Sequence, residues 1–249
     1  MPYLSYGQIV CNWFDVEKTE MDQSTKIALV IGNSNYQSIN KLKNPINDAV
    51  LMKETFLKLG FDTILHKENL NFSGMKTAII EYNELQSKYD MGFIYYAGHG
   101  FQDKDGIAYL IPVDWNKVNS FYGTAISVNS LSKLLSNNRD DKNILILDAC
   151  RSTYKSEDNF SKPDIVEPVN VKMGFSTSYG HVAYDHPELG NSLYTKTLSN
   201  YLLIPNLNIH HIFHSTWNFV YTASHFKQRP VQYFGELMDY LHVNKDNCK

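Results

Sequence analysis

The chain has 249 residues, 43% of them hydrophobic and 13% aromatic, which is enough apolar side chain to fill the core of one large α/β domain. Its 23 basic and 26 acidic residues include no run of Lys or Arg, which argues against nucleic acid as a direct partner. The sequence has no stretch of about 18 apolar residues and no signal-peptide pattern, so we expect no membrane partner and a cytoplasmic protein.

The first predicted elements are an arm, a strand and a helix. Residues 1–24 show no clear period and are expected to form an N-terminal arm, with one domain over residues 25–249. The run KIALVIGN at 26–33 is continuously apolar, which is typical of a strand covered on both faces. A helix is predicted from residue 44 until Gly60 ends it. Helical spacing puts five apolar side chains on its buried face: Ile46, Ala49, Val50, Phe56 and Leu57.

The following segments continue the alternation of strands and helices. We predict strands in FDTILHK, GFIYYA and NILILDA, at residues 61–67, 92–97 and 143–149, and a helix over 71–88. Strands that alternate with helices imply right-handed crossovers and a parallel sheet. Between the last two strands we expect a hairpin that turns at Asp105 and Gly106, and then a short helix.

After residue 150 the pattern weakens and then recovers. Residues 151–172 are polar and contain Pro, so we expect an exposed loop whose lysines, Lys155, Lys162 and Lys172, make it a candidate for self-cleavage. A fifth strand is predicted at 173–178, followed by two amphipathic helices and a short strand in 230–235. On the second helix His210 and His214 lie four residues apart, but without a third ligand they indicate a helix surface and not a metal site.

Two of the predicted strands end at reactive side chains. His99 follows YYAG and is flanked by Gly98 and Gly100, and Cys150 follows LILDA. Cys150 is one of three dispersed cysteines, an odd number that favours a reducing compartment over a disulfide framework. Ligands of an open parallel sheet collect at the carboxyl ends of its strands, where both residues are predicted to lie. Each residue alone is more often structural, but an imidazole and a thiol together are the minimum for covalent acyl transfer.

The residues around this pair resemble a known family. YYAGHG and LDACRS, whose His and Cys are 51 positions apart, resemble the two catalytic motifs of the caspase-like cysteine peptidases, in the metacaspase, paracaspase and bacterial orthocaspase branch. KIALVIGNSNY, LKNPINDAVLM, GFSTSYGHVAYD and NSLYTKTL resemble further motifs of that family in the same order. The resemblance covers roughly residues 25–235. It departs at Arg151 and Ser152, where many metacaspases have His and then Gly or Asn.

The resemblance implies a fold and a set of catalytic roles. The fold would be the caspase-hemoglobinase fold, a three-layer α/β/α sandwich with a mostly parallel central sheet. His99 would be the general base and acid and Cys150 the nucleophile, with an oxyanion hole from the backbone N–H groups of Gly100 and Cys150. No third member of a triad is visible in the sequence. The loop after Cys150 is short and has few acidic residues, so the calcium site of some metacaspases is not carried over, and no metal or other cofactor is expected.

The resemblance also implies a pocket for a basic substrate side chain. Asp148 shares a strand face with residue 150, because side chains repeat every second residue. Together with Asp48 of PINDAV and, in a less close match, Asp185 of HVAYD, it matches the acidic residues of the family's S1 pocket, which binds the side chain before the scissile bond. Partly buried carboxylates are costly unless paired, and a guanidinium would neutralise them. Cleavage after Arg or Lys, and not after Asp, is expected.

Three functions are compatible with these residues. The first is a cysteine endopeptidase for protein or peptide substrates with a basic residue before the cleaved bond, controlled by an activating or inhibitory protein partner. Analogy to stand-alone bacterial members of the family suggests a regulated role in cell death or defence. The second is a catalytically idle caspase-like interaction module, and the third is a Cys-His acyltransferase such as a transamidase. Peptide turnover by the protein and by its Cys150→Ala form distinguishes the three.

Overall fold

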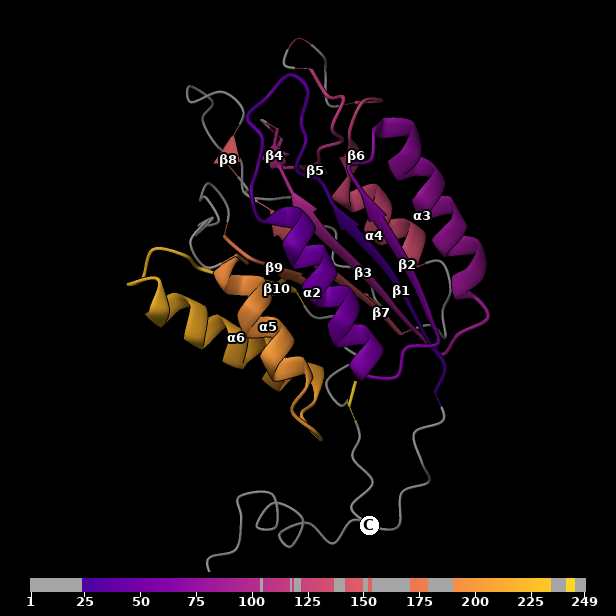
Figure 1. Cartoon of the computed structure of the whole chain (residues 1–249), viewed down its shortest axis with the longest axis vertical. Helices are drawn as coiled ribbons and strands as arrows, with labels where there is room; N and C mark the ends of the chain where they lie inside the picture. The colour runs from indigo at the N-terminus through magenta and orange to yellow at the C-terminus, as the bar shows by residue number, and fades with distance from the viewer. Residues whose placement is uncertain are drawn as a thin grey trace, which may run out of the picture.

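A central sheet of six strands organises the molecule (Figure 1). The computed structural model describes residues 24–103, 105–116, 118, 122–136, 142–149, 152–153, 171–178, 190–233 and 241–244. The strand order is β10-β9-β7-β3-β1-β2, and neighbouring strands are parallel except β10, which is antiparallel to β9. The strands are β1 Lys26–Gly32, β2 Thr63–Glu68, β3 Met91–Gly98, β7 Lys142–Ala149, β9 Val171–Phe175 and β10 Val231–Tyr233.

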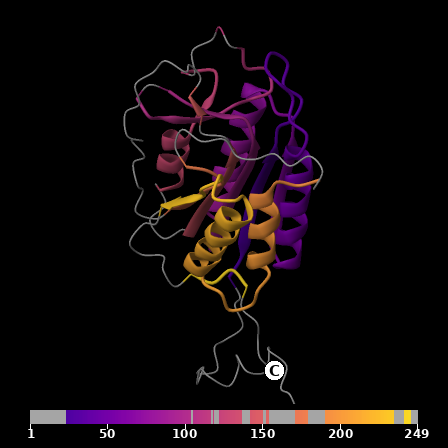
Figure 2. The ribbon, with the colours of Figure 1, turned by 90° about the vertical axis from the view of Figure 1, so that its left-hand side faces the viewer.

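Helices cover both faces of this sheet. On one face lie α2 (Pro45–Lys58), α5 (Leu193–Leu202) and α6 (Ile209–Ala223). On the other face lie α3 (Phe72–Gln86) and α4 (Val128–Leu135). Figure 2 shows the sheet between the two helical layers. Every residue of β1 and β3 is buried, as a strand covered on both faces requires, and the predicted three-layer α/β/α sandwich with a mostly parallel sheet is confirmed.

A second, smaller sheet lies beyond the carboxyl ends of the central strands, at the top of Figure 1. Its order is β6-β5-β4-β8, with β4 at Gly100–Gln102, β5 at Ala108–Leu110, β6 at Ile126–Ser127 and β8 at Ser152–Thr153. The predicted hairpin is confirmed: Asp103 Oδ1 accepts hydrogen bonds from the backbone N–H groups of Asp105 (3.0 Å) and Ile107 (2.9 Å). A separate apolar cluster packs against this sheet: Tyr36, Tyr109, Ile111, Val113, Trp115 and Ala125.

The buried face of α2 differs from the prediction. The helix ends as expected before Gly60, whose φ of 69° suits glycine. However, Val50 and Leu57 are 38% and 57% exposed, whereas Met52 and Asp48 are buried. The prediction aligned the helix by its apolar residues alone. The real face includes the carboxylate of Asp48, whose hydrogen-bond partners are Asn191 and Ser192, the two residues just before α5.

Lys172 is a second correction. It was predicted in an exposed loop before a strand at 173–178, but β9 begins at Val171 and Lys172 is fully buried, opposite Ile144 of β7. Pairing with β7 extends β9 to include Lys172, although the polar side chain of this residue does not by itself favour a buried strand. Lys155 and Lys162 lie outside the described residues, so self-cleavage in that segment stays a prediction.

The two ends of the described region meet at the amino ends of the strands. Lys26, the first residue of β1, donates through Nζ to the carbonyl oxygens of Leu59 and Val243, at 3.4 Å each. The N–H of Ile209 donates to the carbonyl of Leu241 at 2.7 Å, and Val243 is fully buried. Residues 241–244 therefore complete the core. The predicted arm lies outside the described residues except for Ser24.

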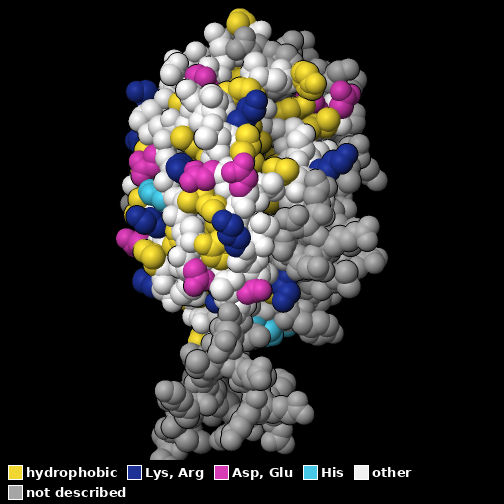
Figure 3. All heavy atoms as spheres, turned by 90° about the vertical axis from the view of Figure 1, so that its right-hand side faces the viewer, with side chains coloured by type: hydrophobic (Ala, Val, Ile, Leu, Met, Phe, Trp, Pro, Cys, Tyr) yellow, Lys and Arg dark blue, Asp and Glu magenta, His cyan; other side chains and the backbone are white. Residues whose placement is uncertain are grey.

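The surface beside the edge strand β2 and helix α3 is of mixed charge (Figure 3). Lys side chains lie among Asp and Glu side chains on this face, and Lys67 of β2 forms an ion pair with Glu81 of α3 at 3.1 Å. Within the described ranges, no helix has the length and apolar character needed to cross a bilayer.

Candidate active site

His99 lies between the two sheets, after the last residue of β3 and before the first residue of β4. Its Nε2 lies 2.7 Å from the backbone carbonyl oxygen of Asn40. A carbonyl oxygen can only accept, so the neutral imidazole carries its proton on Nε2 and leaves Nδ1 as an acceptor. The ring of Tyr36 packs edge-on against the imidazole at 4.5 Å between centroids, and the ring of Phe101 stacks on it at 5.9 Å. The half-buried imidazole is therefore fixed in both orientation and tautomer.

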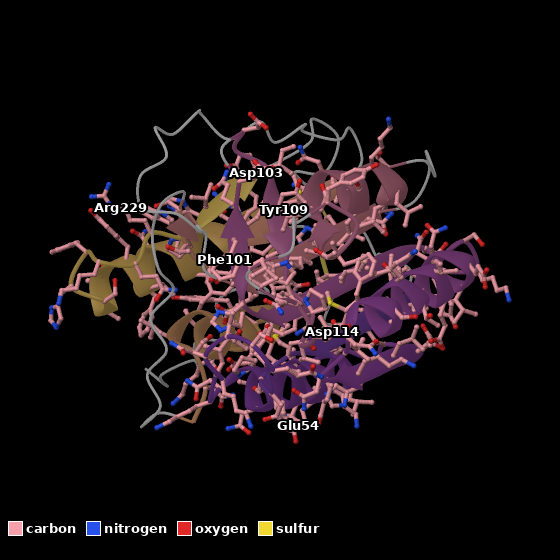
Figure 4. The ribbon with its side chains drawn as sticks, turned by 90° about the horizontal axis from the view of Figure 1, so that it is seen from above. Glu54, Phe101, Asp103, Tyr109, Asp114 and Arg229 are labelled. Carbon is pink, nitrogen blue, oxygen red and sulfur yellow. The ribbon has the colours of Figure 1, made fainter. Side chains whose placement is uncertain are left out.

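An aromatic layer supports this arrangement from the smaller sheet. Seen from above in Figure 4, Phe101 of β4 and Tyr109 of β5 lie over the end of the central sheet, and they are paired residues in the β4–β5 ladder. Phe101 also contacts Trp115, at 5.5 Å between ring centroids. Burial, reinforced by the nearby carboxylate of Asp103, raises the pKa of Tyr109 to about 12. The layer next to His99 is therefore uncharged at neutral pH.

Burial lowers the pKa of His99 below its usual value of 6.5, and the hydrogen bond to Asn40 opposes this only in part. A folded-state pKa below the unfolded one means that the unfolded chain binds the proton more tightly, so acid favours unfolding. We expect the wild type to lose stability as the pH falls below about 6.5, and His99→Gln to lose less. Thermal unfolding of both proteins at about pH 7.5 and about pH 5 measures this difference.

His66, whose pKa is also lowered chiefly by burial, has the same sign of effect. It is present in both proteins, so its contribution cancels in the comparison. An identical fall in melting temperature for wild type and His99→Gln would contradict the expectation.

The ladder between β4 and β5 sets the direction of the Gly100 N–H group. The N–H of Ile111 donates to the carbonyl of His99 at 3.1 Å, so the next pair along this antiparallel ladder, Gly100 and Leu110, is a non-hydrogen-bonded pair. The N–H of Gly100 consequently points away from β5, towards the side on which β8 lies. Because β8 follows Cys150 closely in the sequence, this orientation supports the predicted role of Gly100.

Two buried carboxylates converge at the start of α5. Asp48 lies on α2 and is 2% exposed, and Asp148 lies near the end of β7 and is 7% exposed. Asp48 Oδ1 accepts from the backbone N–H of Ser192 at 2.8 Å and from the side-chain amide of Asn191 at 3.0 Å. Asp148 Oδ2 accepts from the hydroxyl of Ser192 and from that of Thr195, the latter at 2.6 Å. Ser192 thus binds both carboxylates.

The two carboxylates also act on the neighbouring tyrosines. Burial raises the pKa of Tyr95 well above its usual value, and Asp48 and Asp148 add to the effect. Burial and then Asp148 raise the pKa of Tyr194 in the same way. The hydroxyl of Tyr95 lies 2.5 Å from Thr195 Oγ1 and extends the network. Two carboxylates in a site of low polarity are the electrostatic complement of a guanidinium or an ammonium group.

The structure brings four of the predicted site residues to one region. Asp148 is paired with Ala97, two residues before His99, so the two side chains are carried by neighbouring strands at the same sheet edge. Gly100 follows His99 directly, and Asp48 reaches Ser192 from α2. Cys150 and Asp185 lie outside the described residues, and their roles stay predictions. Cys150 follows Ala149 of β7, which is paired with Gly98 at the end of β3.

Several residues of the site were not identified from the sequence. Asn40 acts through its backbone carbonyl, which leaves no side-chain signal. Ser192 is the N-cap of α5, where its hydroxyl accepts from the N–H of Thr195 at 2.9 Å, and a Ser before an amphipathic run is a recognisable cap signal. That signal predicts the helix start but not the second contact with Asp148.

His210 and His214 lie along α6, as their spacing predicted. Their rings stack with centroids 6.4 Å apart, and His214 in turn stacks with Trp217 at 6.2 Å. Across the part of the chain that the structure describes, no three His, Cys, Asp or Glu side chains gather as metal ligands would. These histidines form part of an aromatic row on the helix.

Comparison with known proteins gives the family. The family model described as the caspase domain matches residues 25–242. The chain belongs to the caspase family. Human mucosa-associated lymphoid tissue lymphoma translocation protein 1 is 30% identical to it over 182 residues, which is 72% of this chain and 22% of that protein. The paracaspase of Dictyostelium discoideum is 29% identical over 183 residues, which is 70% of this chain and 43% of that protein.

This caspase domain is therefore related to the paracaspases, as its motifs indicated. The mouse homologue of the human protein is 29% identical over 182 residues. The chain spans about a fifth of the length of the human and mouse relatives and less than half of that of the Dictyostelium protein. The family is one of cysteine proteases, whose substrates are proteins.

Proposed function

We propose that this caspase domain is a cysteine endopeptidase that cleaves proteins after Arg or Lys. The observation that carries the proposal is the pair of buried carboxylates, Asp48 and Asp148, which bind one serine at the same sheet edge as His99. A basic side chain placed against them would be paired with two charges at once, whereas an acidic one would be repelled.

The proposed reaction uses His99 twice. Nδ1 of His99 takes the proton from the Cys150 thiol, and the thiolate attacks the scissile carbonyl carbon. The negative oxygen that forms is stabilised by the backbone N–H groups of Gly100 and Cys150. His99 then protonates the leaving amine, which breaks the peptide bond and leaves an acyl-thioester. A water molecule that gives its proton to His99 hydrolyses this thioester and restores the thiol.

The hydrogen bond from Nε2 to Asn40 supports this cycle. It keeps the acceptor nitrogen Nδ1 available in the resting enzyme, and it stabilises the imidazolium that forms after proton transfer. A backbone carbonyl can do this work without a third catalytic side chain. The role in a regulated cell-death or defence system, with a controlling protein partner, is a proposal that rests on family analogy.

The test is turnover of matched fluorogenic peptides that differ only in the residue before the scissile bond: Arg, Lys, Asp or Ala. We expect hydrolysis of the Arg and Lys peptides, at least about 10²-fold faster than that of the others, and none with Cys150→Ala. Turnover of none of the four by the wild type would favour the idle interaction module. Transfer of the acyl group to an added amine in preference to water would favour the transamidase.

A further inference from the structure

Two buried tyrosine hydroxyls lie against the backbone of His99. The N–H of His99 donates to the hydroxyl oxygen of Tyr36 at 2.7 Å. The hydroxyl of Tyr96 donates to the carbonyl oxygen of His99 at 2.8 Å. The two hydroxyl oxygens are 3.2 Å apart, and both tyrosines are at least 98% buried. The peptide groups on both sides of His99 are therefore held by side chains that are distant in the sequence.

The same hydroxyls connect three segments of the chain. Tyr36 lies in the loop after β1, Tyr96 lies in β3, and both reach the carbonyl oxygen of Ile111 just after β5, at 3.3 Å and 3.0 Å. The loop that carries Tyr36 also carries Asn40, the partner of the imidazole Nε2. One loop consequently contacts both the backbone and the ring of His99.

Gly98 shows how closely the hydroxyls approach. A Cβ atom on Gly98 would lie 2.6 Å from the hydroxyl oxygen of Tyr36 and 2.6 Å from that of Tyr96, which is too close for any real side chain. Glycine at this position is what lets the two hydroxyls reach the next peptide group. Because Gly98 and Gly100 give the backbone around His99 little steric restraint of its own, the restraint must come from other groups.

We propose that Tyr36 and Tyr96 are positioning residues for His99, and that their hydroxyls fix its backbone so that Nε2 meets Asn40 and Nδ1 is left to accept a proton. The inference rests on the proposed function in so far as His99 is the catalytic base. Without the hydroxyls, rotation about the glycine-flanked backbone moves the ring. A displacement of about 1 Å at a catalytic group lowers the rate by up to about 10²-fold.

The kinetic test uses Tyr36→Phe and Tyr96→Phe, which keep the rings and remove only the hydroxyls. We expect each variant to lower kcat for an Arg peptide by about 10- to 100-fold, with KM within about twofold of the wild type, because the carboxylates near Ser192 are untouched. In the double variant the fold-reduction in kcat should be smaller than the product of the two single fold-reductions, because both hydroxyls act on one residue, His99.

Tyr82→Phe is the matched control. Tyr82 is fully buried on α3, and its hydroxyl lies 3.4 Å from Asn143 Oδ1, at the other end of the sheet. Tyr82→Phe should lower the melting temperature about as much as Tyr36→Phe and Tyr96→Phe do, and it should leave kcat unchanged. If Tyr36→Phe and Tyr96→Phe also lowered only the melting temperature, the hydroxyls would be structural and the proposal would be wrong.

A second measurement does not depend on activity. Nitrogen NMR of ¹⁵N-histidine-labelled protein at neutral pH, with the His99 signals assigned from His99→Gln, reports which ring nitrogen carries the proton. We expect the Nε2–H form alone in the wild type and a mixture of the two forms in Tyr36→Phe. An unchanged tautomer in Tyr36→Phe would overturn the proposal, whether or not the wild type hydrolyses any peptide. Absence of peptide hydrolysis by the wild type would count against the proposed function alone.

Discussion

Replacing Cys150 or His99 with Ala is expected to lower kcat/KM for an Arg peptide by at least about 10³-fold. The reason is that the thiolate and the group that forms it act as one unit, so removing either partner removes nearly the whole chemical acceleration. The loss is measured from initial rates of peptide hydrolysis, at a variant concentration high enough that its own rate exceeds that of any contaminating peptidase. Retention of more than about a tenth of the activity by either variant would contradict a Cys150–His99 dyad.

Matched controls exist for both substitutions. Cys248→Ala removes a thiol that lies beyond the residues matched by the caspase domain, and His211→Gln removes an exposed imidazole on α6. Both should keep wild-type rates. His99→Ala also loses the ring contacts with Tyr36 and Phe101, so we expect it to lower the melting temperature, and His99→Gln serves as the variant with less loss of packing.

Asp148→Asn is expected to reduce kcat/KM for Arg peptides by about 30-fold to several thousand-fold, which corresponds to about 2–5 kcal/mol for one partner of a buried, hydrogen-bonded charge pair. The substitution keeps the size of the side chain and removes its charge. Its amide oxygen can still accept from Thr195. The preference for Arg over Ala before the scissile bond should fall by the same factor, because the Ala peptide does not use the charge.

The control removes an equal charge from a neighbouring position. Glu54 lies on α2, as Asp48 does, but it is exposed and points away from the sheet in Figure 4. Glu54→Gln should leave the Arg preference unchanged, and Asp48→Asn should reduce it. An Arg preference that survives in Asp148→Asn would show that these carboxylates are not the pocket.

The arrangement of the sheet could be predicted because local pattern and tertiary environment agree there. The continuous apolar runs at β1, β3 and β7 are what strands covered on both faces require, and two-residue periodicity correctly put Asp148 on the face of Ile144 and Ile146. His99 and Asp148 were therefore found at the right edge. The position of Asp48 came from a family motif, and the apolar pattern of α2 alone would have given a face without it.

The remaining contacts of the site depend on groups that carry no sequence signal. Asn40 contributes a carbonyl that every residue possesses, and Tyr36 and Tyr96 are 60 positions apart, with nothing in either context to pair them. Lys172 was misplaced for the same reason: its burial is decided by pairing with β7 and not by its own polarity. These contacts and the burial of Lys172 are decided by tertiary structure, and local sequence patterns do not predict them.

The meeting of Lys26 with Val243 has a consequence for any larger protein that contains this fold. Both ends of the described region emerge at the amino edge of the sheet, whereas His99 and Asp148 lie at the opposite edge, one strand length or about 20 Å away. A folded neighbour joined at either end would therefore begin on the side remote from His99 and Asp148. The linking segment would need at least about six extended residues to carry the first residue of that neighbour to the edge at which His99 and Asp148 lie.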